Sequence, residues 1–294
     1  MLDLDKLRYF TLIAKPGIVL SNALTLIAGY FLAARWNFNF WLFICSTLGI
    51  MLIVASACVF NNIIDRDIDV LMSRTKNRVS LDQLYPTWVA FAYGIALVFI
   101  GFVLLWFGTN TLATMLALVG FAIYVLAYTL FFKRHSVHGT LIGAFSGSIP
   151  PVVGYVAVTG KIDAIAILLY VALILWQMVH FYAIAIYRLN DYKAANIRVR
   201  PAICGLLDTK IHIICYATAL LCITLMLGFA ANLSIIYKAS MAIVGTLLII
   251  LCRMGFDTKD DIAWGRKVFV FSIIEITIFS VSILLSVSNT DLPI

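Results

Sequence analysis

Nine apolar stretches, each about as long as a bilayer is thick, dominate this sequence. A membrane-spanning helix needs about 20 mainly apolar residues, and in lipid only helices and closed barrels satisfy their own backbone polar groups. The pattern therefore predicts an all-α integral membrane protein, with nine transmembrane helices in one bundle and a single domain over residues 1–294. The expected spans are about 17–34, 40–61, 87–107, 111–132, 139–158, 164–187, 211–232, 234–254 and 267–288.

The composition excludes several other classes of protein. Hydrophobic residues make up 63% of the chain and charged residues 12%, whereas a soluble domain is about 25% charged. A soluble globular protein, a disordered chain and a nucleic-acid-binding module are therefore excluded. The six cysteines are scattered without a C-x-x-C pair, so we interpret them as buried apolar residues rather than a zinc site or a disulfide framework.

The basic residues predict how the bundle is oriented. Of the 21 Lys and Arg residues, 18 fall in alternate connections, and the opposite side keeps only Arg35, Lys161 and Lys238. Cations are retained on the cytoplasmic side of a membrane. The N-terminus is therefore expected in the cytoplasm, and so are the two longest polar loops, 62–86 and 188–210. The polar chemistry of the chain is concentrated on that one face.

The first of these loops carries an unusual cluster of amides and acids. If the second span continues as a helix, Asn61, Asp65 and Asp69 recur every four residues on one face, and Asn62 flanks them. Two carboxylates one turn apart repel each other unless a cation lies between them. Oxygen ligands suit Mg²⁺, which commonly binds one or two carboxylates together with phosphate oxygens. Arg74 and Arg78 follow, and arginine pairs well with phosphate.

A stripe of polar residues runs along the sixth span. Trp176, His180, Tyr187 and Asp191 recur at steps of four, seven and four, and Gln177 flanks them. Polar residues inside a span usually face the bundle interior or a water-filled cavity. The stripe predicts a central, lipid-accessible pocket that opens toward the cytoplasm. His180 alone fits either a hydrogen bond between helices or a contact with a ligand.

Two further polar features lie near the fifth and ninth spans: a basic cluster with two possible roles, and a glutamate with no assigned role. Basic side chains cluster at the cytoplasmic start of the fifth span, where they either extend to the lipid headgroups or bind a substrate anion. They are Lys133, Arg134, His135 and His138. The double proline Pro150-Pro151 predicts a break within the fifth span. Glu275, the only glutamate, lies within the ninth span and has no assigned role.

Several motifs together resemble the protohaem IX farnesyltransferases, a family of intramembrane prenyltransferases. The resemblance rests on N-N-x-x-D-x-x-x-D with R-T-x-x-R, on W-Q-x-x-H and on D-Y-x-x-A-x-I, and related patches extend from residue 15 to residue 273. It implies a nine-helix fold, farnesyl diphosphate and haem B as substrates, and a site on the cytoplasmic side of a bacterial inner membrane. A downstream haem-modifying enzyme or a terminal oxidase assembly is the implied recipient of the product.

The resemblance also assigns roles to individual residues. It implies that Asn61, Asn62, Asp65 and Asp69 hold Mg²⁺. Asp65, Asp69, Arg74 and Arg78 are then expected to act in catalysis. The remaining candidates, expected to bind substrate, are Lys133, Arg134, His135, His138, Trp176, Gln177, His180, Tyr187 and Asp191. His180 is expected to contact the haem, either as a ligand of the iron or by stacking.

The chain departs from the family pattern at several places, and other functions remain open. Arg198-Val199-Arg200 replaces a Pro-x-Leu-Pro run, and Ser148-Ile149 stands before the double proline where small residues are expected. Ala195 stands where aromatic prenyltransferases carry a second aspartate four residues after Asp191, and this loss fits the haem enzymes better than the quinone enzymes. The nearest alternative is a prenyltransferase acting on an aromatic acid or a quinone precursor. Two other hypotheses are a permease that uses Glu275 and His180, and a haem-binding protein without catalysis.

Overall fold

The computed structural model describes residues 4–73, 75–76 and 85–287, and within those ranges every regular element is helical. Nine helices of this part of the chain are long and apolar enough to cross a membrane. They are Pro16–Ala34 (α2), Phe40–Ile64 (α3), Thr87–Gly108 (α5), Thr111–His135 (α6 to α7), Gly139–Thr159 (α8 and α9), Ala164–Tyr187 (α10), Leu206–Ala230 (α13), Ile235–Met254 (α14) and Asp261–Ser286 (α15). The predicted all-α fold with nine spans is confirmed.

The seventh and ninth spans begin five and six residues earlier than expected, at Leu206 and Asp261. The sequence pattern placed the charged residues there in loops. In the structure they form the first turns of α13 and α15, and Lys210 on α13 pairs with Asp261 on α15. Each early turn therefore compensates the charge of the other, which lets both helices extend beyond their apolar stretches.

The bundle is held together by a few close helix pairs. Helix α2 packs on α9, α3 on α5, and α10 on both α13 and α15. Glycine allows the closest approach: a Cβ atom at Gly154 of α9 would lie 2.2 Å from the Leu26 carbonyl oxygen of α2. Such small-residue contacts are typical of helices in lipid. Apolar side chains such as Phe107 and Ile235 remain exposed on the outer surface, where lipid would meet them.

The fifth span is interrupted where the double proline predicts it. Helix α8 (Gly139–Gly147) ends before Ser148, and α9 (Ile149–Thr159) begins with both prolines in its first turn. Proline is tolerated there because its missing N–H has no partner within the helix. The Ser148 hydroxyl donates to the Ala144 carbonyl and accepts a hydrogen bond from Gln177 on α10. The interruption is thus buried and satisfied by polar partners.

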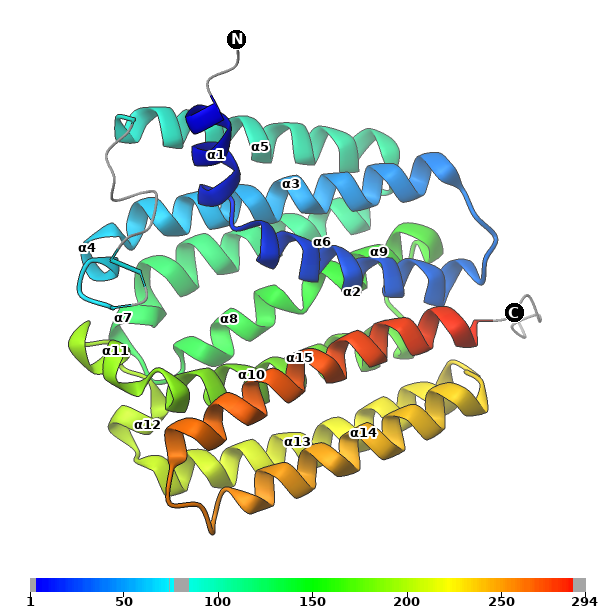
Figure 1. Cartoon of the computed structure of the whole chain (residues 1–294). Helices are drawn as coiled ribbons and strands as arrows, with labels where there is room; N and C mark the ends of the chain where they lie inside the picture. The colour runs from blue at the N-terminus through cyan, green and yellow to red at the C-terminus, as the bar shows by residue number, and fades with distance from the viewer. Residues whose placement is uncertain (1–3, 74, 77–84, 288–294) are drawn as a thin grey trace.

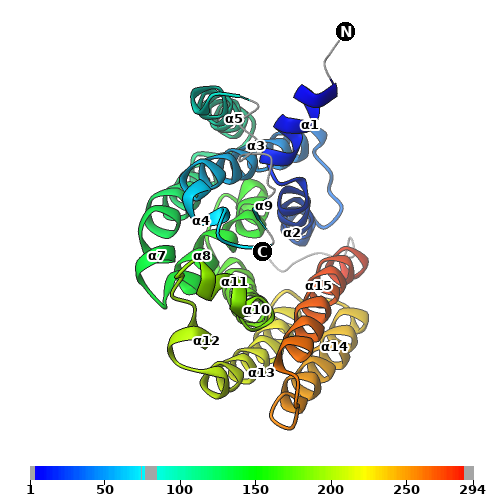
Figure 2. The ribbon, with the colours of Figure 1, turned by 60° about the vertical axis from the view of Figure 1, so that its left-hand side comes forward.

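The short elements gather at one end of the bundle. These are α4 (Arg66–Asp69), α7 (Lys133–His135), α11 (Leu189–Ala194) and α12 (Arg200–Ile203). Figures 1 and 2 both place them together, at the left end of the long helices in Figure 1. The predicted polar loops therefore meet in space although they are more than 100 residues apart in the chain.

Candidate active site

Asp65 lies at the centre of a buried polar cluster at this end of the bundle. Its side chain is 0% exposed. The Asn61 amide nitrogen donates to its Oδ2 atom at 2.6 Å, and the Lys133 ammonium, from the end of the fourth span, donates to the same oxygen. Arg134 lies 3.7 Å from the other oxygen, Oδ1. A carboxylate can be buried when it is paired in this way.

Helix α3 does not continue unbroken through this motif, as the sequence pattern allowed. It ends at Ile64, and Asp65 is its C-terminal cap, followed by the single turn α4. The backbone spacing is nevertheless retained, because Asp65 N–H donates to the Asn61 carbonyl and Asp69 N–H to the Asp65 carbonyl, both at 2.9 Å. Asp69 is buried, at 1% exposure, and it lines a large cavity.

This cavity has a volume of about 570 Å³ and extends from the polar end into the bundle. Ligand pockets usually measure about 300–1,000 Å³. Seven of the candidate residues line it together: Asn61, Asp69, Lys133, Trp176, Gln177, His180 and Tyr187. Two other lining residues, Ile18 on α2 and Ile273 on α15, are 43% and 44% exposed. The cavity therefore reaches the lipid-facing surface as well as the polar end.

Other candidate residues lie outside the cavity lining. Asn62 donates to the Ile13 carbonyl and anchors the N-terminal helix α1 (Leu4–Ile13) to α3. His135 contacts the carbonyl of Phe131 in its own helix, and His138 precedes the first turn of α8. Both histidines are exposed. Arg74 and Arg78 fall outside the residues that the structure describes.

Arg134 binds a carboxylate that the sequence pattern did not assign to the site. Its two terminal nitrogens each lie 2.7 Å from an oxygen of Asp67, and one of them also donates to the Ile64 carbonyl. The guanidinium lowers the pKa of Asp67 below its usual value, mainly through these hydrogen bonds. Arg134 thus fixes α4 against the end of the fourth span.

Asp191 joins the two polar loops. Its Oδ1 atom accepts hydrogen bonds from the Ser73 backbone N–H at 3.0 Å and from the Ser73 hydroxyl at 2.6 Å. The predicted stripe is therefore divided: Trp176, His180 and Tyr187 remain on α10 and line the cavity, whereas Asp191 lies on α11 and holds the segment that follows α4.

Some residues at the site could not be recognised from their own sequence context. Lys15 precedes α2 in a left-handed backbone conformation (φ 53°), and its ammonium donates to the Asn61 side-chain oxygen at 2.6 Å. A lysine at the end of a span ordinarily extends to the headgroups. Thr129 approaches Asn61 from a π-helical stretch, Ile123–Phe132, whose Tyr124 and Tyr128 line the cavity. π-Helical turns are frequent at functional sites.

The donor set fits a hard divalent cation that is shared with a substrate. Asp65 Oδ1 is buried and has no hydrogen-bond partner, although its other oxygen has two. No group of three or more His, Cys, Asp or Glu side chains in the described ranges is placed to hold a metal. Asn61 and Asp69 line the cavity, and Asp65 contacts Asn61. A cation held by these residues would leave coordination positions that substrate oxygens would complete, as Mg²⁺ commonly requires.

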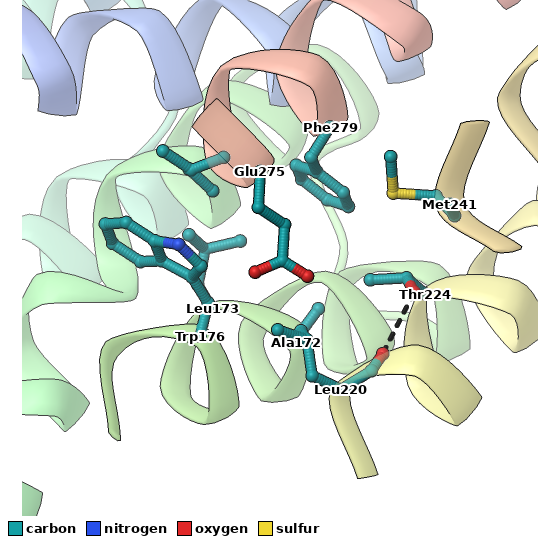
Figure 3. Close-up of a pocket in the computed structure, with 9 residues that line it drawn as sticks. Ala172, Leu173, Trp176, Leu220, Thr224, Met241, Glu275 and Phe279 are labelled. Atoms are coloured by element: carbon teal, nitrogen blue, oxygen red, sulfur yellow. Dashed lines mark hydrogen bonds between the residues drawn. The ribbon is translucent and has the colours of Figure 1, made fainter. Parts of the chain in front are cut away.

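Glu275 lies behind the cavity wall rather than in the cavity. Its side chain is 5% exposed, and Oε2 is buried without a hydrogen-bond partner. Figure 3 shows the carboxyl group pointing from α15 into a space bounded by Trp176, Leu220 and Met241. That space measures about 10 Å³, roughly the minimum for a single water molecule. Glu275 is not among the residues that line the large cavity.

Comparison with known sequences identifies the family. The UbiA prenyltransferase family model matches residues 22–274. The chain is 46% identical over 285 residues to a protein of Chromohalobacter salexigens named protoheme IX farnesyltransferase, with 97% of each chain covered. It is 45% identical over 287 residues to a protein of the same name from Serratia proteamaculans, with 98% of this chain and 97% of that protein covered.

Comparison with solved structures agrees with the fold. A structure of digeranylgeranylglyceryl phosphate synthase superposes with a TM-score of 0.81 at 17% identity, covering 97% of this chain and all of the other. A UbiA homologue from Archaeoglobus fulgidus, bound to GPP and Mg²⁺, has a TM-score of 0.73 at 14% identity, with 94% of this chain and 99% of that chain covered. With its sequence matches and its helix arrangement in agreement, the chain belongs to the UbiA prenyltransferase family.

Proposed function

We propose that this protein transfers the farnesyl group of farnesyl diphosphate to a vinyl group of haem B, with addition of water, to give haem O and diphosphate. The observation that carries the proposal is the placement of the Asn61–Asp65–Lys133 cluster beside a cavity that runs from basic residues into an apolar bundle. A substrate with a diphosphate head and a long hydrocarbon tail matches this change from a basic end to an apolar interior. The relatives named protoheme IX farnesyltransferase support the choice of haem as acceptor.

The polar end would bind the diphosphate. Asp65 and Asp69, with Asn61 assisting, would hold Mg²⁺, which supplies Lewis-acid stabilisation of the departing negative charge, worth several kcal/mol. Lys15 and Lys133 already line this part of the cavity and add fixed positive charge. In the free protein these ammonium groups donate to Asn61 and Asp65, respectively. In the substrate complex they would donate to diphosphate oxygens instead. We extend this anion-binding role to Arg74 and Arg78, as the resemblance implies.

The apolar part of the cavity would hold the farnesyl chain. As the bond between the allylic carbon and oxygen breaks, positive charge develops on the farnesyl group. Aromatic rings lining the cavity, among them Tyr124, Tyr128 and Trp176, can stabilise that charge and exclude water. The opening beside Ile18 and Ile273 gives the hydrocarbon a path from the bilayer.

Haem B would enter the same cavity with its vinyl edge toward the farnesyl carbon. The vinyl group attacks that carbon, a water molecule adds to the resulting haem-side cation, and a proton leaves. Arg188 and Arg198 line the cavity, where their charges can compensate the propionates. Because the basic connections predict that this end of the bundle is cytoplasmic, we place the active site on the cytoplasmic side of a bacterial inner membrane.

Mass spectrometry of the product tests this proposal. Purified protein with haem B, farnesyl diphosphate and Mg²⁺ is expected to form a hydroxyethylfarnesyl haem and release diphosphate. An aromatic acid, 4-hydroxybenzoate, serves as the competing acceptor because prenyltransferases of quinone synthesis are the nearest alternative. Prenylation of that acid with unmodified haem would contradict the proposal. Haem binding without diphosphate release would instead identify a non-catalytic haem carrier. Solute flux that does not depend on metal would identify a permease.

A further inference from the structure

Ser272 connects two candidate residues of the cavity wall. It lies on α15 and is 0% exposed. Its hydroxyl is 2.8 Å from His180 Nδ1, and its carbonyl accepts a hydrogen bond from Trp176 Nε1 at 2.7 Å. One residue of the ninth span therefore holds two side chains of the sixth span, through its side chain and its backbone respectively.

The hydrogen-bond network around Ser272 favours one tautomer of His180. A serine hydroxyl carries a single hydrogen. The Ser272 hydroxyl lies 2.7 Å from the Phe269 carbonyl oxygen, which can only accept, so the hydroxyl hydrogen is donated there. The contact with His180 Nδ1 must then use a hydrogen on the imidazole. This assigns the proton of neutral His180 to Nδ1 and leaves Nε2 with a free lone pair.

The aromatic neighbours of His180 restrict how a ligand can meet the ring. Trp176 stacks on it, with ring centroids 4.9 Å apart and an angle of 22° between the planes. Phe269 packs at 5.0 Å and 44°, and Phe181 at 5.5 Å and 64°. His180 nevertheless lines the cavity. With a stacking partner already on the ring, the Nε2 edge is the part of the imidazole best placed to meet a ligand.

We infer that Ser272 is a positioning residue that holds His180 as the Nδ1–H tautomer, so that Nε2 is presented to the cavity as a ligand for the iron of the haem acceptor. The inference rests on the proposed function and deepens it, because it selects ligation over stacking. Metal-ligating histidines almost always donate their other ring N–H to a fixed acceptor, which sets the tautomer and orients the ring. The Ser272 hydroxyl occupies that acceptor position.

The test compares two porphyrins that differ only in the metal. Haem B and metal-free protoporphyrin IX are titrated into purified wild-type protein and Ser272→Ala, with binding followed by absorbance for the first and by fluorescence for the second. Loss of the outer hydrogen bond to a ligating histidine typically costs 10–100-fold in affinity. Ser272→Ala is therefore expected to weaken haem B binding about 10-fold and to change the Soret spectrum, while protoporphyrin IX binds as in the wild type.

Matched variants separate positioning from packing. Ser280→Ala removes a hydroxyl that is equally buried on the same helix and bonds only to the Ile276 carbonyl, and it should bind both porphyrins normally. Ser272→Thr keeps the hydroxyl and should restore the wild-type haem spectrum. If Ser272→Ala does not fold, His180→Ala provides the test, because added imidazole should restore the spectrum of ligated haem.

Three results would overturn the inference: unchanged haem affinity in Ser272→Ala, equal weakening for both porphyrins, or no effect of imidazole on His180→Ala. These results are distinct from failure of the proposed function. Wild-type protein that binds haem through His180 yet forms no farnesylated haem would contradict the function and leave the role of Ser272 intact. Farnesylated haem formed by the wild type, together with unchanged haem affinity in Ser272→Ala, would contradict only the inference.

Discussion

At the residue scale, the chain contains two buried acids that differ in how they are accommodated. Asp65 is surrounded by an amide and two cations from other parts of the bundle. Glu275 has an apolar environment, and its Oε2 atom has no partner. Burial of a polar group costs free energy unless a hydrogen bond replaces its water. The first arrangement is typical of a binding site, and the second is a cost to stability.

Replacement of Glu275 by leucine is therefore expected to stabilise the protein. An unsatisfied buried polar group typically costs about 1–3 kcal/mol, and an apolar side chain of similar size removes that cost. The thermal midpoint of unfolding in detergent should rise in Glu275→Leu relative to the wild type. A lowered midpoint would show that the carboxyl group has a stabilising partner, such as a water molecule in the adjacent 10 Å³ space.

Contacts between residues that are far apart in the chain could not be predicted from the sequence. The spacing of Asn61, Asp65 and Asp69 already indicated a cation site because those residues are neighbours on one helix. Lys15 and Ser272 join the site through contacts 46 and 92 residues away in the chain. Nothing in the local context of a lysine before a span, or a serine within one, distinguishes these roles from headgroup binding or helix packing.

At the element scale, the long helices could be predicted closely and the short ones could not. Apolar length alone located the spans, because lipid imposes it. The short helices α4, α11 and α12 depend on tertiary contacts such as the bond from Ser73 to Asp191. Isolated helices of that length are unstable, so their sequences carry no independent signal.

Asp191 is expected to hold the two polar loops together through its hydrogen bonds to Ser73. Asp191→Ala removes the acceptor for Ser73, whereas Asp191→Asn keeps an oxygen at that position. Hydrogen exchange of residues 70–73 should accelerate in the alanine variant and remain near wild type in the asparagine variant. Equal hydrogen-exchange rates in both variants would contradict this role of Asp191. Loss of transfer activity in Asp191→Asn with normal exchange would instead identify Asp191 as a metal ligand.

The pairing of α2 with α9 provides a second prediction at this scale. In Gly154→Ala the new Cβ atom would lie 2.2 Å from the Leu26 carbonyl oxygen, so the two helices must separate. Overpacking of this kind costs about 1–3 kcal/mol, and the thermal midpoint should fall. Gly17→Ala, also at a helical glycine, is the matched control because no atom lies within 4 Å of its Cβ position. Equal midpoints for the two variants would contradict the role assigned to this contact.

At the scale of the whole molecule, most of the basic residues lie in the connections at one end of the bundle. The short helices lie together at the end shown on the left in Figure 1, and the basic residues that line the cavity, among them Lys133 and Arg188, belong to the same end. The sequence predicted this coincidence from the alternation of basic connections, because each helix reverses the direction of the chain. The depth of the cavity and its opening between α2 and α15 required the structure, since they depend on how the helices pack.

The orientation in the membrane is a prediction from the basic connections, and it can be measured directly. Cys204 is exposed beside α12 at the polar end, and Lys161 is exposed in the connection before α10. In a background with Cys215 and Cys222 replaced by alanine, a membrane-impermeant maleimide should label Lys161→Cys in intact cells and Cys204 only in inverted vesicles. The reverse pattern would place the N-terminus and the active site outside.

The role of Asp65 and Asp69 is tested most directly by diphosphate release in the double variant Asp65→Asn/Asp69→Asn, with haem B and farnesyl diphosphate as substrates. Asp257→Asn, which changes an exposed carboxylate in the connection before α15, is the control. We predict that the double variant loses activity by at least about 100-fold, as expected when preorganised charge stabilisation is removed, and that chelation of divalent metal does the same to the wild type. Near-normal release of diphosphate by the double variant, or by metal-depleted wild-type protein, would contradict the claim that these two carboxylates hold the ion that drives the reaction.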